Sequence, residues 1–570
     1  MQNLDVVAIF NELADLLEIK GENPFKVRAY RNAARVLESL GESVEGMVDR
    51  GEDLTKLPGI GEDLAEKIKE IVRTGKLQKL EALKKEIPES LRSMLSIEGL
   101  GPKRVKILYE KLHLTDTESL EKAAREHKIS ALEGFGPKTE EAIIKGVRLL
   151  KQEGVRHLFA EAEPIADELV SYLKKAPGLK SVDVAGSFRR KKETVGDLDV
   201  LCIAKKPAEV IDYFTKFERI AEVVSAGTTR ATVVLKNALQ IDLRAVKEES
   251  YGAALHYFTG SKTHVIAVRK IAIDMGLKIN EYGVYRGEKK IAGRDEAGVY
   301  KTVKLPFIPP ELREDRGEIE AAAKGGLPNL IERSDLRGDL HMHTTYSDGI
   351  HTIEEMVQKA QRLGYEYIAI TDHSPGLAMI KGLDVKKAQK QIEEIDRLNE
   401  KLKNFRILKG MEVDIHEDGS LDMEKAILEA LDIVTAAVHS KFSLSKKEQT
   451  KRVLKAIENP LVHVIAHPTG RLIGKRKAIL LDMEKIYKEA AKAGVAMEIN
   501  AQPERLDLND IHIREAKEHG VKFTISTDAH AKDQLDFIRY GINQARRGWI
   551  EKGDVLNTQP LKKLLKTLVR

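Results

Sequence analysis

From residue 336 to the C-terminus, short apolar runs typical of β-strands alternate with helical stretches, and histidines stand where the runs end. Eleven of the 16 histidines lie after residue 340, and six of them occupy such positions. Alternating strands and helices predict an α/β barrel or a doubly wound sheet. In a barrel the carboxyl ends of parallel strands meet at one mouth, so side chains at these ends converge there. We therefore expect one α/β domain with a histidine-rich centre.

Three acidic residues share this placement: Asp348 lies in a glycine-bearing loop, Glu412 ends one run and Asp528 ends another. His341 and His343 alternate along a single run, so both imidazoles leave the same strand face. Nine nitrogen and oxygen donors are too many for one ion and suit three, with Glu412 as a bridge. Metals grouped in this way favour hydrolysis of a phosphate ester. The nine candidate ligands are His341, His343, Asp348, His373, Glu412, His439, His467, Asp528 and His530.

The other histidines of this region fall outside the pattern, and we expect them on the surface or in packing. Arg471 follows His467 by four residues and is either a phosphate contact or an exposed loop arginine without a role. The five histidines outside the pattern are His351, His416, His463, His512 and His519.

A second acidic constellation lies in the first half of the chain. Asp197 and Asp199 are one residue apart on an apolar run, so their carboxylates leave the same strand face. Such a pair suits two Mg²⁺ (or Mn²⁺) ions that bridge a triphosphate. Asp242, on a separate apolar run, would bind the metal that activates a primer 3′-hydroxyl. We expect these three carboxylates to be catalytic.

A glycine turn precedes the acidic pair and provides candidates for nucleotide binding. Its backbone and hydroxyl donors can hold phosphates, and an arginine can neutralise their charge. Antibiotic nucleotidyltransferases and RNA-tailing enzymes use similar elements, so these residues alone leave the substrate open. The candidates are Gly186, Ser187, Arg190 and Gly196.

Three copies of an apolar-x-Gly-apolar-Gly turn occur in residues 1 to 150, which otherwise have the periodicity of successive helices. Backbone N–H groups at such a turn, together with the start of the following helix, favour an anion. Three copies, followed by Lys67, Lys103 and Lys138, predict contacts with nucleic-acid phosphates rather than base edges. The glycine pairs are Gly59 and Gly61, Gly99 and Gly101, and Gly134 and Gly136.

The middle of the chain changes in character. Residues 180 to 245 switch to β-branched runs, and the segment from Pro309 to Asn329 has the charge, glycine and proline content of a linker with a short helix.

The composition of the chain excludes some classes of protein. No segment approaches the apolar run of a membrane span, and the first residues lack signal-peptide features. Cys202 is the only cysteine, so we expect no internal disulfide and a reducing cytoplasm. The formal net charge of +5 is too small to indicate a class of binding partner.

Residues 1 to about 310 resemble DNA polymerase β and its relatives in family X. The glycine turns resemble helix-hairpin-helix motifs, and Tyr257-Phe258-Thr259-Gly260-Ser261 with Arg269 resembles the nucleotide-selecting subdomain. The resemblance implies that Tyr257, Phe258 and Gly260 contact the incoming nucleotide and that Arg269 contacts the template strand. This chain departs from the vertebrate pattern at three positions, Lys191, Gln240 and Val265, so fidelity does not carry over.

The segment from Leu57 to Glu81 resembles the amino-terminal lyase domain of DNA polymerase β. The resemblance puts Lys67 at the position of the lysine that forms a Schiff base with 5′-deoxyribose phosphate, and Lys79 at a phosphate-binding lysine. Asp63 stands where the family often has another lysine. A carboxylate there would raise the pKa of Lys67, which opposes lyase activity.

Residues 336 to 570 resemble the polymerase-and-histidinol-phosphatase (PHP) domain, a distorted (β/α)₇ barrel. By that resemblance three Zn²⁺ or Mn²⁺ ions are bound: the first by His341, His343, Glu412 and Asp528, the second by Glu412, His439 and His467, and the third by Asp348, His373 and His530.

Together the resemblances imply a multidomain chain. The expected parts are a lyase-like helical domain (1–85), a fingers-like region with two helix-hairpin-helix motifs (86–150), a nucleotidyltransferase palm of the α+β class (151–246), a thumb-like subdomain (247–315), a linker (316–335) and the PHP barrel (336–570).

The order of these parts resembles that of long family-X polymerases of bacteria and some archaea. It implies filling of short gaps in base excision repair, with a metal-dependent 3′→5′ exonuclease and cleavage at abasic sites assigned to the barrel. The expected partners are gapped or 3′-recessed DNA and dNTPs, with no membrane. We expect a cytoplasmic, nucleoid-associated monomer. Two alternatives make the barrel a structural scaffold or a small-molecule phosphatase.

Overall fold

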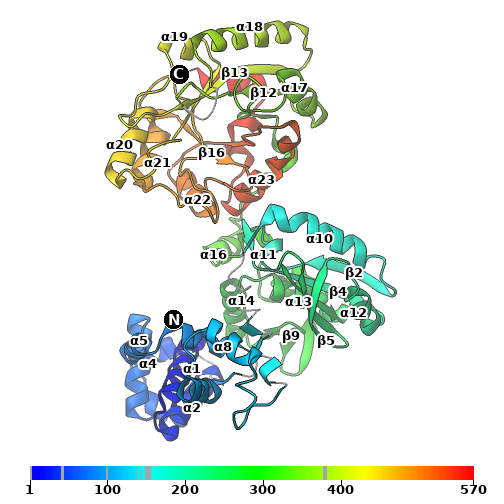
Figure 1. The fold of residues 1–570 in the computed structure, drawn as a ribbon, viewed down its shortest axis with the longest axis vertical. Coiled ribbons are helices and arrows are strands. Elements are labelled where there is room, and N and C mark those ends of the chain that lie inside the picture. Colours follow the sequence, from blue (N-terminus) through cyan, green and yellow to red (C-terminus); the bar gives the residue numbers. More distant parts are fainter. Residues whose placement is uncertain are drawn as a thin grey trace. The chain divides into compact units, whose positions relative to one another are not determined.

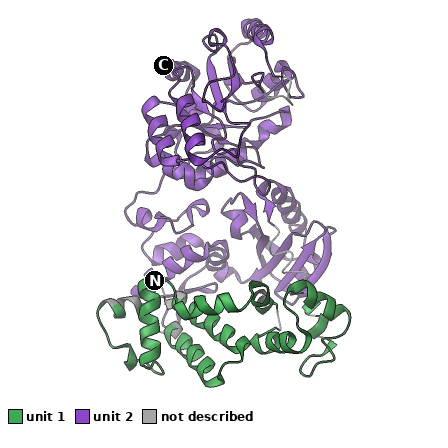
Figure 2. Cartoon of the chain, turned by 60° about the vertical axis from the view of Figure 1, so that its left-hand side comes forward, with its two compact units in different colours: residues 1–155 green, residues 156–570 purple. Residues whose placement is uncertain are grey.

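The structure is a computed structural model that describes residues 3–39, 44–97, 100–137, 139–141, 143–144, 146–147, 156–376 and 382–569. The chain divides into two compact units, residues 1–155 and 156–570 (Figure 2). None of the described helices is both long and apolar enough to cross a membrane.

The first unit is helical and shares one apolar core. Helix α4 shows how the sequence builds it, because Leu64, Ile68 and Ile71 recur at helical spacing and are buried. The helix ends at Gly75, which adopts a left-handed conformation suited to glycine. The α-helices with defined bounds in the described residues of this unit are α1 (Asn3–Lys20), α2 (Pro24–Ser39), α3 (Val44–Asp49), α4 (Glu62–Thr74), α5 (Gln78–Glu86), α6 (Glu89–Ser93), α7 (Pro102–Leu112) and α8 (Thr117–Arg125), with short 3₁₀ turns at Leu54–Lys56 and Met94–Ser96.

The second unit begins with the palm region, residues 156–246, which is a five-stranded sheet in the order β2-β4-β7-β6-β5. On β4, Leu198, Val200 and Cys202 enter the core, so Asp197 and Asp199 lie on the opposite face. The elements are β1 (His157–Leu158), α10 (Phe159–Leu173), β2 (Leu179–Val184), α11 (Gly186–Arg189), β3 (Thr194–Val195), β4 (Asp197–Ala204), α12 (Pro207–Phe214), β5 (Ile220–Ala226), β6 (Arg230–Leu235) and β7 (Gln240–Val246).

The thumb region, residues 247–315, combines helices with a small antiparallel sheet in the order β10-β9-β8 (Figure 1). The segment that follows is packed against it, because Ile319 and Ala322 join its core. The elements are a 3₁₀ turn at Glu248–Ser250, α13 (Tyr251–Thr259), α14 (Lys262–Asp274), β8 (Lys278–Asn280), β9 (Gly283–Arg286), β10 (Lys289–Ala292), α15 (Glu296–Thr302), a 3₁₀ turn at Pro310–Leu312 and α16 (Glu318–Ala323).

The barrel, residues 336–569, contains seven strands that pair in chain order, each parallel to the next. A parallel bridge between Met342 and Ala529 joins the two ends of the sheet and nearly closes it. The strands are β11 (Gly338–Asp339), β12 (Tyr367–Ile370), β13 (Arg406–Asp414), β14 (Ile433–Ala437), β15 (Val464–Ile465), β16 (Ala496–Asn500) and β17 (Phe523–Ser526). The expected seven-stranded barrel is thus confirmed.

Helices follow the strands and cover the barrel, as expected of a β/α fold (Figure 1). They are α17 (Ile353–Arg362), α18 (Val385–Lys401), α19 (Lys425–Leu428), α20 (Lys446–Ile457), α21 (Met483–Ala493), α22 (Asp510–Glu518), α23 (Ile538–Arg547) and α24 (Leu561–Leu568), with 3₁₀ segments at Arg333–Asp335, Lys532–Phe537, Lys552–Asp554 and Leu556–Thr558.

Candidate functional site

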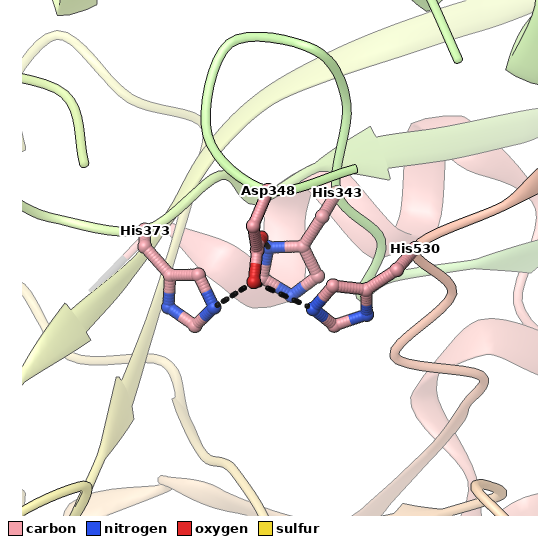
Figure 3. Close-up of side chains that lie close together, drawn as sticks. All are labelled: His343, Asp348, His373 and His530. Atoms are coloured by element: carbon pink, nitrogen blue, oxygen red, sulfur yellow. Dashed lines mark ion pairs between the residues drawn. The ribbon is translucent and has the colours of Figure 1, made fainter. Parts of the chain in front are cut away.

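The nine candidate ligands of the barrel gather at one mouth. Eight of them form three overlapping groups, and His467 joins them through Glu412. In one group His343, His373 and His530 surround Asp348 (Figure 3). The Asp348 Oδ2 atom lies 3.2 Å from His530 Nε2 and 3.7 Å from His373 Nε2. This group contains the expected trio of Asp348, His373 and His530, and His343 joins it.

A second group contains His341, His343 and Asp528. His343 Nε2 lies 3.1 Å from Asp528 Oδ1 and 3.2 Å from His341 Nε2. Asp528 itself has a φ of 51°, in the left-handed region that non-glycine residues seldom occupy. Backbone strain of this kind is characteristic of functional sites.

Glu412 joins the groups. Its Oε1 atom lies 2.9 Å from His467 Nε2 and 3.2 Å from His439 Nε2, and its Oε2 atom lies 3.0 Å from His373 Nδ1. His341 and His343 approach Oε2 at 3.4 and 3.5 Å. A carboxylate with imidazoles on both oxygens has the geometry expected of a bridging ligand.

The donor set fits divalent metal ions. Buried Glu412 Oε2, His373 Nδ1 and His343 Nδ1 form no hydrogen bond, although such atoms are costly to leave unpaired. Burial, together with the neighbouring His530 and His373, lowers the pKa of His343 to about 3, so this imidazole is neutral and free to ligate. Burial opposes ionisation of Glu412, but the surrounding histidines hold its pKa well below the usual range.

A second layer of carboxylates orients these ligands, and the sequence analysis did not identify it. Glu498 Oε1 accepts from His341 Nδ1 at 2.7 Å, and Glu498 Oε2 accepts from the His467 backbone N–H at 2.8 Å. Asp414 accepts from His439 Nδ1. Such partners fix the tautomer and direction of a ligating histidine. Glu498 was visible in principle, since it lies on a buried apolar run that ends in Asn500.

The other residues singled out in this region belong to none of the three groups. Of the five remaining histidines, His463 bridges the Val434 N–H and the Leu568 carbonyl, and His512 contacts Tyr487. Arg471 is not an exposed loop residue: its side chain is 13% exposed and pairs with Glu193 of the palm region.

In the palm region, β4 and β7 are parallel neighbours, and their register sets Asp199 beside Asp242. Burial, reinforced by Asp197 and Asp242, raises the pKa of Asp199 to about 7. Burial and Asp242 also raise the pKa of Asp197. A divalent cation would neutralise this cluster of three carboxylates.

Asp242 is already engaged by its neighbours. Its Oδ1 atom accepts from Thr232 Oγ1 at 2.6 Å and from Arg230 at 3.0 Å, and its Oδ2 atom accepts from Gln240 at 2.8 Å. Among the described residues, the groups with ligand atoms within 4.8 Å of one another all lie in the barrel. The palm carboxylates are adjacent but do not converge as tightly.

The glycine turn upstream lies against this site. Gly186 has a φ of 61°, and a β-carbon on it would come within 2.6 Å of Asp199 Oδ2, so glycine is required there. Ser187 follows in α11 (Gly186–Arg189), and Gly196 directly precedes β4 (Asp197–Ala204). Arg190 donates to the Thr259 carbonyl at 2.5 Å and to Glu314 at 3.0 Å. Lys191 lies over the rings of Phe159 and Phe188.

The thumb residues flank this turn. Tyr257 and Phe258 end α13 in an edge-to-face pair with ring centroids 5.0 Å apart. Arg269 lies over the Tyr257 ring at 5.4 Å and donates to the Ile279 carbonyl at 2.9 Å. A β-carbon on Gly260 would lie 3.1 Å from Arg190 Nη1, so the two candidate nucleotide-binding residues are neighbours.

The glycine turns of the first unit share one geometry. The N–H of the second apolar residue bonds the carbonyl three residues earlier in each copy: Ile60 to Leu57, Leu100 to Ile97 and Phe135 to Leu132. Ile60, Leu100 and Phe135, the second apolar residues of the three turns, are buried. A β-carbon at Gly59, Gly61, Gly101, Gly134 or Gly136 would meet nothing within 4 Å, so the backbone of these turns is open to a ligand. Gly99 and Lys138 lie outside the described residues.

Lys67 lies in α4 and pairs with Asp63 one turn earlier. Its hydrogen bond is the main reason that the pKa of Asp63 is lowered. The Lys67 amine is thus held by a carboxylate, whereas a Schiff-base lysine must be free to attack a sugar carbon. Lys79 lies over the Tyr30 ring, and burial followed by repulsion from Lys26 lowers its pKa.

Four domain families match parts of this chain. They are the helix-hairpin-helix domain (residues 1–77), the SAM-like helix-hairpin-helix tandem (91–149), the DNA polymerase beta thumb (254–314) and the PHP domain (339–502).

Two relatives match different lengths of the chain. A DNA polymerase/3′-5′ exonuclease PolX from Bacillus subtilis is 41% identical over 567 residues, 99% of this chain and 98% of the relative. A probable phosphatase from Thermoanaerobacter sp. is 32% identical over 231 residues, 39% of this chain and 89% of the relative. The full-length match includes the helix-hairpin-helix, thumb and barrel regions together. The chain therefore belongs to the PolX family of DNA polymerases.

Proposed function

We propose that this chain is a DNA polymerase of family X that also hydrolyses DNA from 3′ ends. The observation that carries the proposal is the full-length match to a DNA polymerase/3′-5′ exonuclease. The chain presents two acidic centres for these activities, the palm carboxylates and the barrel mouth. The first would add nucleotides, and the second would remove them.

For synthesis, we assign Asp197, Asp199 and Asp242 as the ligands of Mg²⁺ or Mn²⁺. These ions would neutralise the triphosphate and activate the primer 3′-hydroxyl. Gly186 brings the turn close to Asp199, so that the Ser187 backbone and hydroxyl can donate to the phosphates. Tyr257 and Phe258 would support the sugar of the nucleotide, and Arg269 the template strand.

For hydrolysis, we assign all nine barrel ligands to Zn²⁺ or Mn²⁺. Bound ions would supply Lewis-acid activation of water and of the phosphate ester. Glu412 holds the groups in register, Glu498 orients His341, and Asp414 orients His439.

We infer further that the open glycine turns bind the DNA backbone without reading sequence. Gapped or 3′-recessed DNA would be the substrate, and short-gap filling in base excision repair the role, in the cytoplasm at the nucleoid. Cleavage at abasic sites belongs to the same proposal. The Lys67–Asp63 pair argues against 5′-deoxyribose phosphate lyase activity by Lys67.

A small-molecule phosphatase is the second candidate for the barrel, because relatives named as probable phosphatases match 34 to 39% of this chain, a length that one domain such as the barrel can supply. A scaffold role is less well supported, since every ligand position holds a competent side chain. The barrel ligands do not distinguish the two phosphoesterase substrates.

The test compares three substrates on one purified chain. We expect incorporation of one dNTP into a gap with a 5′-phosphate, and release of nucleotides from a single-stranded 3′ end. Release from a small phosphomonoester should be far slower. Faster hydrolysis of the small ester than of DNA would contradict the nuclease assignment, and failure to fill the gap would contradict the polymerase assignment.

A further inference from the structure

The loop from Arg190 to Glu193 joins the glycine turn to β3, and two arginines of the barrel hold it. Arg547 donates to the Arg190 carbonyl oxygen at 2.7 Å. Arg471 forms a bidentate pair with the Glu193 carboxylate at 3.2 and 2.6 Å. Both ends of a candidate nucleotide-binding loop are thus fixed by side chains from another domain.

Arg547 is a buried charge with a complete set of partners. Only 5% of the residue is exposed, and it pairs with Glu314 at 3.1 Å and Asp510 at 2.6 Å. Glu314 also accepts from Arg190 Nε at 3.0 Å. A single carboxylate therefore links the barrel arginine to the palm arginine that we assign to the triphosphate. Buried, hydrogen-bonded pairs of this kind specify geometry strongly.

Arg471 links the same loop to the barrel mouth. It lies four residues after His467, and its guanidinium also donates to the Leu506 carbonyl at 2.6 Å. The two hydrogen bonds to Glu193 fix both direction and distance, as bidentate arginine pairs do. This use of Arg471 explains why it is not available for phosphate at the barrel site.

Apolar packing accompanies these polar contacts. Tyr540 of α23 and Leu506 join the palm core, and Tyr540 packs edge-on against Phe159 with ring centroids 6.1 Å apart. The same helix carries Arg539, which pairs with Glu163 of the palm while its side chain remains 49% exposed. The two domains therefore meet through a packed contact that includes one exposed ion pair away from the loop.

We propose that Arg547 and Arg471 are positioning residues for nucleotide binding, through which the barrel holds the palm loop in the form that accepts a triphosphate. The inference rests on the proposed polymerase function. Loss of either contact leaves the catalytic carboxylates in place but frees the loop that carries Arg190. Nucleotide binding should then weaken more than the chemical step, so KM for the dNTP rises while kcat changes little.

The experiment uses the full chain in single-nucleotide gap filling, with KM and kcat measured over a range of dNTP concentrations. Arg547→Ala should raise KM between about 10- and 100-fold, as expected when a binding group is misplaced from a distance. Arg547→Lys keeps the positive charge but not the planar guanidinium with its several donors. Its KM should lie between those of Arg547→Ala and the parent. Arg539→Ala is the matched control on the same helix and should behave like the parent.

Glu193→Gln covers the case in which Arg547→Ala does not fold, because Glu193 is partly exposed and the substitution keeps its shape. It should raise KM several-fold without altering the melting temperature beyond a few degrees. Parental KM in folded Arg547→Ala and Glu193→Gln would overturn the inference, as would an equal rise in Arg539→Ala. A parent chain that fills no gap would instead overturn the proposed function itself.

Discussion

The barrel mouth and the palm are both candidate metal sites at strand ends, but they differ in how complete their ligand sets are. In the barrel, eight side chains from around the mouth lie in three tight groups, and His467 contacts Glu412 of one group. Glu498 and Asp414 accept hydrogen bonds from His341 and His439 on the far side of these ligands. In the palm, three carboxylates come from two strands, and Asp242 is engaged by Thr232, Arg230 and Gln240.

The difference is one of preorganisation. Each barrel carboxylate is balanced by several imidazoles, and Glu412 and Asp528 have pKa values held well below the usual range despite their burial. In the palm, burial and then the neighbouring carboxylates Asp197 and Asp242 raise the pKa of Asp199 to about 7. We infer that the barrel is built to retain ions, whereas the palm is completed when ions arrive with the triphosphate.

The largest expected effect is the loss of hydrolysis in Glu412→Ala. This substitution removes a ligand shared by the groups, and the loss should reach about 10³-fold because bound metal supplies several kcal/mol to the transition state. Gap filling should continue at the parental rate. Release of label from a single-stranded 3′ end measures the first activity and gap filling the second.

Glu417→Ala is the matched control for Glu412, since Glu417 follows the same strand but its side chain is 57% exposed. It should leave both activities unchanged. Full exonuclease activity in Glu412→Ala would remove the phosphoesterase assignment and favour a scaffold role for the barrel.

A comparable effect, confined to the other centre, is expected for Asp199→Ala. Synthesis should fall by about 10³-fold, because the substitution removes a ligand from the two-metal site. Hydrolysis should persist, since no barrel ligand is touched. Asp212→Ala, an exposed acid of α12, is the control. If Asp199→Ala also loses hydrolysis, the two centres are not independent and the comparison fails.

A smaller effect is expected from Glu498→Gln, which keeps all nine ligands. Loss of the charge behind His341 should weaken metal binding by about 10- to 100-fold, the usual consequence of removing such a partner. Metal content after dialysis and the Mn²⁺ concentration needed for half-maximal hydrolysis both report it. Glu504→Gln changes an exposed glutamate that pairs with Lys475 and should have no effect. Unchanged metal retention in Glu498→Gln would mean that metal binding by the barrel does not depend on the carboxylate behind His341.

Much of the fold could be predicted from local pattern. The β-branched runs predicted between residues 180 and 245 include β2, β4 and β6, which the structure places at Leu179–Val184, Asp197–Ala204 and Arg230–Leu235. Alternation alone left the C-terminal region open between a barrel and a doubly wound sheet. The bridge between Met342 and Ala529 shows that the sheet is a barrel. No local sequence pattern could have predicted a contact between residues so distant in sequence.

The candidate sites, like the fold, could be predicted in part from the sequence. The barrel ligands stand at strand ends, so their position in the sequence suffices to suggest convergence. Which ligands share a group depends on side-chain direction, and His343 belongs to two groups. Asp242 also depends on Thr232 from the neighbouring strand β6. Arg471 resembles a loop arginine until Glu193, 278 positions away, is seen beside it.

The smallest expected effect is on stability and concerns the palm alone. In metal-free buffer the folded chain binds a proton at Asp199 with a pKa of about 7, whereas an unfolded aspartate has a pKa of about 3.9. Between these values the folded state holds the extra proton, so the free energy of unfolding falls as the pH rises from about 4 to about 7 and is constant above that.

Asp199→Asn removes the free-energy cost of ionising this carboxylate in the folded state. The variant should therefore be more stable than the parent by on the order of 1 kcal/mol above pH 7, with the difference shrinking towards pH 4. Melting temperatures in EDTA across this range measure it, with Asp167→Asn, an exposed acid of α10, as the control. Addition of Mg²⁺ should narrow the difference, because a bound cation favours the ionised form of Asp199. A difference that does not vary with pH would show that the folded chain does not hold the extra proton at Asp199, and the contrast with the barrel would then rest on geometry alone.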